Sequence, residues 1–296
     1  PFADRDEIDH ITGDRTDTER LATAARRSQP DVVIDCIAYH PAEVRTATEI
    51  FADVDAYVYV SSGAAYIDRA IPKREAETPL KRCTSEQATD DSLESYGPRK
   101  AEGDRVVFEA AERGINAISL RPTLVYGPHD YQAFLEYWIH RVNEHDRIVV
   151  PGDGTAIWHR VYVEDVASAI RTVAERGEPG EAYNVGDREV LTLDDTIETI
   201  SEAIGTPIEV IHAGPRELDE VGLDPGDFPL YHHPDTGYPH MVETCKLASL
   251  GWTSTSLSTA MERTVRDALA SRGEGIELGP SRETEEELLR HHEQSE

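Results

Sequence analysis

Short runs of β-branched and aromatic residues alternate with segments of helical spacing over the first 120 residues of the chain. Asp31–Cys36, Ala56–Val60 and Asn116–Leu120 have the length and composition of strands buried on both faces of a sheet. Pro41–Phe51 and the charged, alanine-rich Ala101–Arg113 lie between them and have helical character. Strands joined by helices imply parallel pairing. The sequence therefore predicts an α/β fold built on a doubly wound parallel sheet.

The alternation continues in the second half of the chain. Phe134, Tyr137 and Trp138 have helical spacing, which favours a place in the core over a ring-stacking platform. Further strands and helices are predicted at the following segments: strands at Ala182–Val185 and Ile208–Ile211, and helices at Val163–Ala174, Leu193–Ile204 and Leu257–Ala270.

Two polar stretches interrupt and end this pattern. Residues 214–240 are rich in Pro, Gly, Asp and His, so we expect an irregular surface excursion there. Residues 273–296 are polar and include three consecutive glutamates, and we expect a disordered tail or a solvated helix without function.

Composition excludes several classes of protein. The chain has 296 residues, enough for one large or two modest domains. No apolar run approaches the roughly 18 residues that span a bilayer, which excludes a membrane protein. The net charge is −29, from 58 acidic and 29 basic residues, so the surface repels phosphate backbones and argues against nucleic-acid binding by charge. Dense carboxylates with few lysines suggest a high-salt cytosol, with ordinary acidic solubility as the alternative.

The cysteines indicate the redox state of the compartment, and the first residue indicates whether the chain is a fragment. Cys36, Cys83 and Cys245 are an odd, widely spaced set that indicates neither a disulfide framework nor a zinc site. We therefore expect a reducing compartment and a cytoplasmic location. The chain begins at Pro1 and has only 2 methionines, both internal, so we expect a fragment or a trimmed chain. Any targeting segment would lie upstream of it.

A Tyr-x-x-x-Lys motif is the first candidate for chemistry. Tyr96 and Lys100 are separated by three residues, which places both side chains on one helical face. A phenol has a pKa of about 10, and a nearby ammonium lowers it by favouring the phenolate, so Tyr96 could transfer protons near neutral pH. Pro98 requires the helix to begin close by. The motif alone is more typical of an ordinary exposed helix pair.

A serine pair precedes this motif. Ser61 and Ser62 follow a predicted strand, at the carboxyl end where open α/β sheets place their active sites. A hydroxyl there could hydrogen-bond the same substrate oxygen as Tyr96. A Ser-Ser-Gly sequence can also be an ordinary turn.

Several further segments come in a recognisable order. They include Thr12–Asp17, the strand ending Asp35-Cys-Ile-Ala38, Arg121–Pro128, Pro151–Gly154 with Val161–Ala167, Glu181–Gly186 and Lys246–Trp252. With Ser62 and the Tyr-x-x-x-Lys motif, this ordered set resembles the extended short-chain dehydrogenase/reductases, the NAD-dependent epimerase/dehydratase family. The likeness runs from about Ile8 to Leu250.

The resemblance implies a division of the chain. Residues 1–125 and about 160–186 would form a Rossmann-like domain that binds NAD or NADP. Residues from about 126–159 and 187–270 would form a smaller substrate subdomain, and 271–296 an acidic tail. Family members often dimerise through two long helices, which here would be Pro41–Phe51 and Ser95–Arg113.

The resemblance also implies roles for individual residues. Tyr96 would be the acid/base in hydride transfer, Lys100 would lower its pKa and hold the nicotinamide ribose, and Ser62 would bind the reacting oxygen. The cofactor-binding residues would be Asp14 and Arg15 near the adenine, Ile37, Ala38 and His40 along the dinucleotide, and Pro122 to Val125 beside the nicotinamide. An epimerase returns the hydride to the other face of the substrate, and a reductase does not.

One departure from the family concerns the cofactor. The Gly-rich turn that holds the pyrophosphate is absent, because the chain begins at the approach to the third strand. The segment that would contain it amounts to roughly 40 residues. We expect this polypeptide alone to bind NAD(P) weakly and its parent protein to bind it well. The residue that selects NAD or NADP should lie in the same absent segment.

Other departures concern the substrate. Gly63 and Ala64 stand where family 4,6-dehydratases have an Asp-Glu pair, so we expect no 4,6-dehydration. Leu124 replaces a substrate-binding asparagine, and Trp158 replaces a pyrophosphate-binding arginine. Arg160 is two residues on, on the same strand face, and could stand in for that arginine.

Two alternatives remain open. The sequence favours an NAD(P)-dependent epimerase or reductase acting on a sugar-like or nucleotide-sugar substrate. A non-catalytic NAD(P)- or RNA-binding protein on the same fold is the alternative, because the residues that bind the nucleotide sugar in typical family members are replaced. A metal is not expected, although His232, His233, Asp235 and His240 offer ligand atoms.

Overall fold

The computed structural model describes residues 7–67, 69–231, 241–270 and 278–295. The chain divides into two compact units, the first containing residues 1–67, 79–121 and 170–183, and the second residues 68–78, 122–169 and 184–296. Residues 68–78 and 160–169 thus belong to the second unit, whereas the sequence-based division placed them in the cofactor domain.

A four-stranded sheet organises the first unit. Its strand order is β1 (Val32–Asp35), β2 (Ala56–Val60), β3 (Ala117–Pro122) and β7 (Ala182–Val185). β1 pairs with β2 in parallel, and β2 pairs with β3 in parallel. β2 and β3 are almost wholly buried, as their apolar composition predicts. The prediction of a parallel-sheet α/β fold is therefore confirmed.

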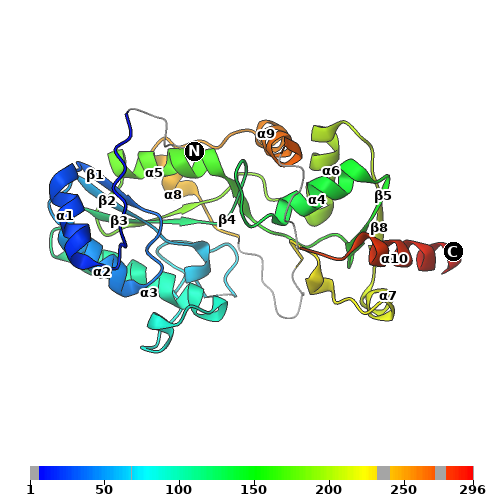
Figure 1. Cartoon of the computed structure of the whole chain (residues 1–296), viewed down its shortest axis with the longest axis horizontal. Helices are drawn as coiled ribbons and strands as arrows, with labels where there is room; N and C mark the ends of the chain where they lie inside the picture. Colours follow the sequence, from blue (N-terminus) through cyan, green and yellow to red (C-terminus); the bar gives the residue numbers. More distant parts are fainter. Residues whose placement is uncertain (1–6, 68, 232–240, 271–277, 296) are drawn as a thin grey trace. The chain divides into compact units, whose positions relative to one another are not determined.

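Helices α1 (Thr18–Ser28), α2 (Pro41–Ile50) and α3 (Leu93–Glu112) accompany this sheet, and α5 (Val163–Arg176) leads towards β7. α2 begins with Pro41 at its first position, and Glu43 closes a capping box. Figure 1 shows α2 and α3 side by side, where their apolar faces share one cluster with β2. α3 begins at Leu93, so Pro98 lies inside the helix and not at its start. The short 3-10 turns are η1 (Gly63–Ala65) and η2 (Gln87–Thr89).

The second unit contains two short parallel strand pairs. β4 (Leu124–Tyr126) pairs with β6 (Arg160–Tyr162), and β5 (Arg147–Pro151) pairs with β8 (Glu209–Ala213). The other elements are α4 (Phe134–Glu144), α6 (Leu193–Ile204), α7 (Pro215–Glu220), η3 (Pro225–Asp227), α8 (Cys245–Ser249), α9 (Leu257–Ala270) and α10 (Arg282–Ser295).

The core of the second unit centres on α4. Trp138 is fully buried, stacks on Phe228 with ring centroids 6.2 Å apart, and donates its indole N–H to the carbonyl of Pro229. Tyr137 is buried beside it, and Phe134 packs against the same cluster. The prediction that these aromatic residues are core residues is therefore confirmed.

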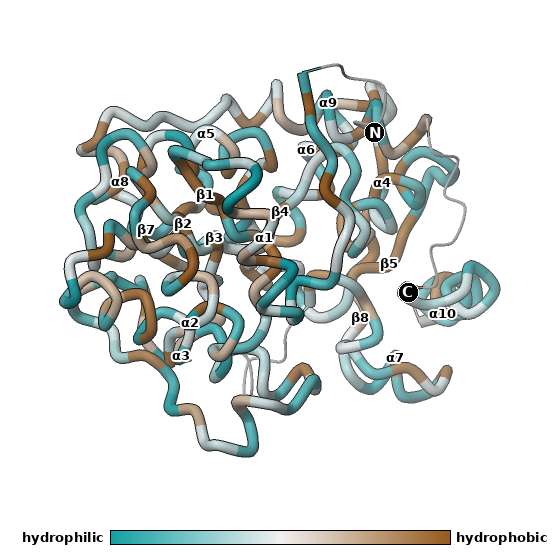
Figure 2. Tube along the Cα trace, turned by 60° about the vertical axis from the view of Figure 1, so that its left-hand side comes forward, coloured by the Kyte–Doolittle hydropathy of each residue, from teal (hydrophilic) through white to brown (hydrophobic). Residues whose placement is uncertain are grey.

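At the end of the chain the helical alternative is correct for residues 282–295, but the expectation that such a helix is solvated is wrong in part. They form α10, which buries Leu288 and Leu289 in the core and the carboxylate of Glu285 completely. The polar composition of this segment conceals a narrow stripe of buried positions at helical spacing. In Figure 2 α10 is largely hydrophilic, whereas the neighbouring β5 is hydrophobic.

The prediction for residues 214–240 is wrong in part, since α7 and η3 give regular structure to its first half. Residues 232–240 lie outside the described part of the chain. Within the described residues, no helix is both long and apolar enough to cross a membrane.

Candidate functional site

The turn that follows β2 carries Ser62. Its hydroxyl accepts a hydrogen bond of 3.1 Å from the N–H of Ala64 and caps η1. This turn packs against α3, because a Cβ built on Gly97 would lie 2.5 Å from the carbonyl oxygen of Ala64. Only a glycine permits that approach. The turn bearing Ser62 therefore contacts α3 at the residue next to Tyr96.

Tyr96 and Lys100 lie one turn apart on α3. The Lys100 ammonium is 5.9 Å from the centroid of the Tyr96 ring. It donates hydrogen bonds to the carbonyl of Ala38 at 3.1 Å and to that of Val60 at 2.9 Å. Lys100 is only 2% exposed, and burial lowers its pKa to about 8. The ammonium is therefore fixed where β1 and β2 end.

A buried ion pair supports Lys100 from within the first unit. Asp104 follows Lys100 by one helical turn, and its carboxylate accepts hydrogen bonds from Arg121 at 2.8 Å and Ser119 at 2.5 Å. Arg121 also donates to the hydroxyl of Tyr66 at 2.6 Å. The charge of Asp104 raises the pKa of Lys100 and so opposes the effect of burial. The sequence analysis did not identify Asp104, although its i+4 spacing from Lys100 was a usable signal.

The loop after β1 is organised by Asp35. Its carboxylate accepts two hydrogen bonds from Arg15, at 2.7 and 3.0 Å, and one from the Tyr57 hydroxyl at 2.7 Å. It also accepts the N–H of Ala38 at 3.1 Å. Burial, reinforced by the charge of Asp35, raises the pKa of Tyr57. Asp35 was quoted in the strand motif but given no role, and an acid at the end of an apolar strand was the signal.

The other predicted cofactor-binding residues of the first unit differ in their exposure to solvent. Asp14 is exposed, and hydrogen bonds from the backbone and hydroxyl of Thr16 lower its pKa. Ala38 is buried, whereas Ile37 is 58% exposed and Tyr39 is 45% exposed. The loop therefore presents apolar side chains to solvent beside the Lys100 ammonium.

His40 begins α2 and contacts a distant part of the sequence. Its Nδ1 lies 3.1 Å from the carbonyl oxygen of Ala88, and its Nε2 lies 3.0 Å from Oδ1 of Asp91. Asp91 also accepts a hydrogen bond of 3.2 Å from Arg99 on α3. His40 thus joins the loop after β1 to the residues that lead into α3.

The remaining predicted site residues belong to the second unit. Arg160 stands opposite Leu124 in the β4–β6 pair. It is 5% exposed, its Nη2 donates to Thr196 at 3.1 Å, and its guanidinium is 5.4 Å from the centroid of the Tyr126 ring. Among the described residues its Nη1 has no hydrogen-bond partner. Pro122 ends β3, Val125 lies in β4, and Trp158 packs against the core.

Asp187 is a further titratable group in the second unit. Its carboxylate accepts the N–H of Tyr162 at 3.1 Å, and its carbonyl accepts a hydrogen bond from His159 at 2.7 Å. Burial raises its pKa to about 6. Asp187 was not predicted from the sequence, although it directly follows the quoted segment Glu181–Gly186.

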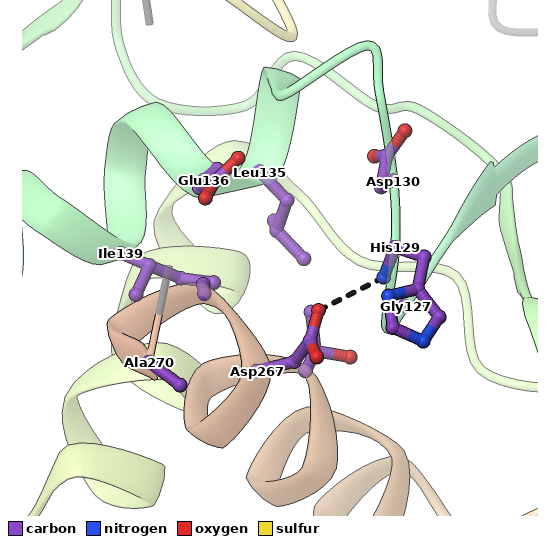
Figure 3. Close-up of a pocket in the computed structure, with 10 residues that line it drawn as sticks. Gly127, His129, Asp130, Leu135, Glu136, Ile139, Asp267 and Ala270 are labelled. Atoms are coloured by element: carbon purple, nitrogen blue, oxygen red, sulfur yellow. Dashed lines mark hydrogen bonds between the residues drawn. The ribbon is translucent and has the colours of Figure 1, made fainter. Parts of the chain in front are cut away.

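The second unit also contains an open pocket of about 400 Å³. Figure 3 shows it between α4, α9 and the loop after β4, with Leu135 and Ile139 on one side and Asp267 on the other. The carboxylate of Asp267 accepts the N–H of His129 at 2.8 Å. Asp130 lies at the rim, where burial raises its pKa.

No group of three or more potential metal ligands occurs among the described residues. The histidine-rich candidate set, His232, His233, Asp235 and His240, lies outside them.

Comparison with known proteins gives the chain a family. Residues 1–186 match the model described as the NAD dependent epimerase/dehydratase family. The chloroplast stem-loop binding protein of 41 kDa b from Arabidopsis thaliana is 29% identical over 74% of this chain and 55% of its own length. The dTDP-D-glucose 4,6-dehydratase of Mus musculus is 26% identical over 68% of this chain and 52% of its own length. The chain spans about half the length of these relatives.

The fold is also that of a solved enzyme. The structure of dTDP-glucose 4,6-dehydratase from Bacillus anthracis, in complex with NAD, superimposes with a TM-score of 0.70 at 18% identity. The match covers 93% of this chain and 83% of that one. Because dehydratases are among the relatives, the likenesses give no support to the expectation that 4,6-dehydration is excluded.

Proposed function

The chain belongs to the NAD dependent epimerase/dehydratase family, and on that premise we propose that it catalyses NAD(P)-dependent hydride transfer on a nucleotide-sugar substrate as an epimerase or reductase, with Tyr96 as the acid/base. The placement of Lys100 carries this proposal. Two backbone carbonyls at the strand ends fix the buried Lys100 ammonium one helical turn from the half-buried Tyr96 phenol. This arrangement is suited to proton transfer.

The loop after β1 fits a dinucleotide cofactor. Exposed Ile37 and Tyr39 offer apolar surface that a planar ring can cover. Ile37, Ala38 and His40 would line the dinucleotide, with Asp14 and Arg15 near its adenine end. When bound, the cofactor supplies a hydride acceptor or donor at its nicotinamide ring. Lys100 would hold the nicotinamide ribose, and the family resemblance assigns Pro122 and Val125 to the nicotinamide ring.

Four side chains would take part in proton transfer. The positive charge of Lys100 favours the phenolate form of Tyr96, which can then accept the proton of a substrate hydroxyl. Tyr96 returns that proton when the substrate carbonyl is reduced. Ser62 would donate a hydrogen bond to the same oxygen. Asp104 would keep Lys100 charged near neutral pH, because its negative charge raises the lysine pKa.

Substrate recognition would fall to the second unit. The buried Arg160 guanidinium has an Nη1 without a hydrogen-bond partner among the described residues, and an anionic substrate group would satisfy it. Leu124 and Trp158 would provide apolar contacts in place of the polar substrate-binding side chains of typical family members. The η1 turn, Gly63–Ala65, contains no carboxylate, so we propose that any acid/base for water loss is absent from this turn.

A two-part assay on the full-length protein tests the proposal. Calorimetric titration should show micromolar binding of NAD or NADP. Incubation with UDP-, dTDP- and GDP-linked hexoses should yield an epimer of unchanged mass, or a 4-keto sugar should be reduced with a gain of two mass units. A product lighter by one water would contradict the epimerase or reductase assignment.

The second candidate function is non-catalytic binding, which the stem-loop binding relative favours. Tight cofactor binding without turnover of any sugar, together with RNA binding, would support it over the enzyme.

A further inference from the structure

Residues 84–92 form a short excursion that leads into α3 and is held largely by its own polar groups. Thr84 and Gln87 exchange backbone-to-side-chain hydrogen bonds of 3.0 and 3.2 Å. Asp90 accepts hydrogen bonds from the hydroxyls of Ser92 and Ser95 at the start of the helix. Residues 84–92 thus have a defined local structure, and their contacts with other segments fix their position within the first unit.

His40 provides the contact with the loop after β1. Both ring nitrogens face acceptors, because Nδ1 is 3.1 Å from the Ala88 carbonyl oxygen and Nε2 is 3.0 Å from the Asp91 carboxylate. Neither partner can donate a hydrogen bond. A neutral imidazole has one N–H and can make one of these bonds, whereas the imidazolium makes both.

Charged groups from several segments surround the ring. Glu43 on α2 accepts the backbone N–H of His40 at 3.1 Å, and Asp91 of the excursion faces the ring itself. Arg99 on α3 donates to the same carboxylate oxygen of Asp91, Oδ1, at 3.2 Å. The other charged groups near this loop are Asp35, which accepts the Ala38 N–H, Lys100, which donates to the Ala38 carbonyl, and Asp90, which is engaged by serines.

We propose that His40 is a positioning residue that ties residues 84–92 to the loop after β1 through these two ring contacts. The tie fixes the start of α3, which bears Tyr96 and Lys100, relative to the loop that would carry the dinucleotide. Its effect on the cofactor rests on the proposed function, whereas the tie itself does not. The His40 ring is 25% exposed and Asp91 is 89% exposed. We therefore expect loss of this contact to change local protection and cofactor affinity only modestly, by about threefold.

Hydrogen exchange of the full-length protein without cofactor tests the tie. In H40Q and D91N, amides of residues 84–92 should be about threefold less protected than in the wild type at the same pH, after correction for intrinsic rates. E49Q on the exposed side of α2 removes the same charge as D91N and should behave as wild type.

Equal protection of residues 84–92 in the wild type, H40Q and D91N would overturn the inference. NADH affinity provides the functional arm: D91N should weaken binding about threefold, although Asp91 is not on the proposed dinucleotide path. Lost protection with unchanged affinity would contradict the positioning role. If the wild type binds no NADH or NADPH, the proposed function fails, and the exchange experiment still decides whether the tie exists.

Discussion

Lys100 is the residue at which burial and charge oppose each other most directly. Burial lowers its pKa, and the carboxylates of Asp104 and Asp35 raise it, with a net value of about 8 against the ordinary 10.5. The lysine is therefore charged at neutral pH and close to losing its proton. A pKa of about 8 allows the ammonium to stabilise a phenolate near neutral pH and still exchange its own proton.

The shifted pKa of Lys100 predicts how stability depends on pH. Between about pH 8 and 10.5 the unfolded chain holds a proton on this lysine that the folded chain has lost, so the free energy of unfolding rises with pH in this window. Relative to K100M, the wild type should gain about 2 kcal/mol between pH 7 and 9.5. Urea unfolding at both pH values measures this difference, and an unchanged difference would show that the lysine titrates normally.

At the level of secondary-structure elements, α10 is held by a buried carboxylate. Glu285 is fully buried, contacts Arg282 at 2.9 Å and Arg141 at 3.2 Å, and accepts the backbone N–H of Val149 in β5 at 2.8 Å. It therefore satisfies an edge-strand donor as well as two guanidinium groups. Removing its charge takes from both guanidinium groups their buried carboxylate partner.

Glu285→Gln should destabilise the protein by about 3 kcal/mol, the usual cost of removing one partner of a buried ion pair. Glu287→Gln on the exposed side of the same helix changes the charge equally and should cost less than about 0.5 kcal/mol. Thermal or urea unfolding of both variants compares them. Equal effects would mean that α10 does not depend on the buried charge.

The elements that sequence reasoning predicted best are those with a strong apolar period. The strand Ala56–Val60 and the helix Leu193–Ile204 have the predicted bounds, because each has a clear pattern and well-placed end signals. α10 was expected only as a solvated alternative to disorder, because only a few positions of a polar segment are buried. β5 was missed because an isolated five-residue apolar run gives no sign of its distant partner β8.

The candidate site was predictable where its residues are neighbours in sequence. Tyr96 and Lys100 form a local motif, and Ser62 follows a recognisable strand. The supporting groups could not be inferred, because Asp104 meets Arg121 and His40 meets Asp91 only after folding. Spacing along a chain does not report such long-range contacts.

On the scale of the whole molecule, the dominant property is a net charge of −29. Repulsion among 58 acidic side chains opposes the compact state, and salt screens it. The exposed ion pairs contribute little and are weakened by the same screening. Salt should therefore stabilise this protein on balance.

Raising KCl from 0.1 to 2 M should raise the Tm on the order of 10 °C, equivalent to a few kcal/mol. Calorimetry across a KCl series measures this, and the same series in sucrose controls for solvent exclusion. A constant or falling Tm would contradict the high-salt interpretation and favour ordinary acidic solubility.

The most direct test of the proposed chemistry is the Tyr96→Phe variant of the full-length protein, measured by hydride transfer to NAD(P) in a single turnover. The phenyl ring keeps the packing on α3 and removes the one group that is proposed to move the proton. Transfer should fall by at least about 100-fold while cofactor binding stays within twofold of the wild type. Undiminished transfer would show that another group moves the proton and would contradict the role given to Tyr96.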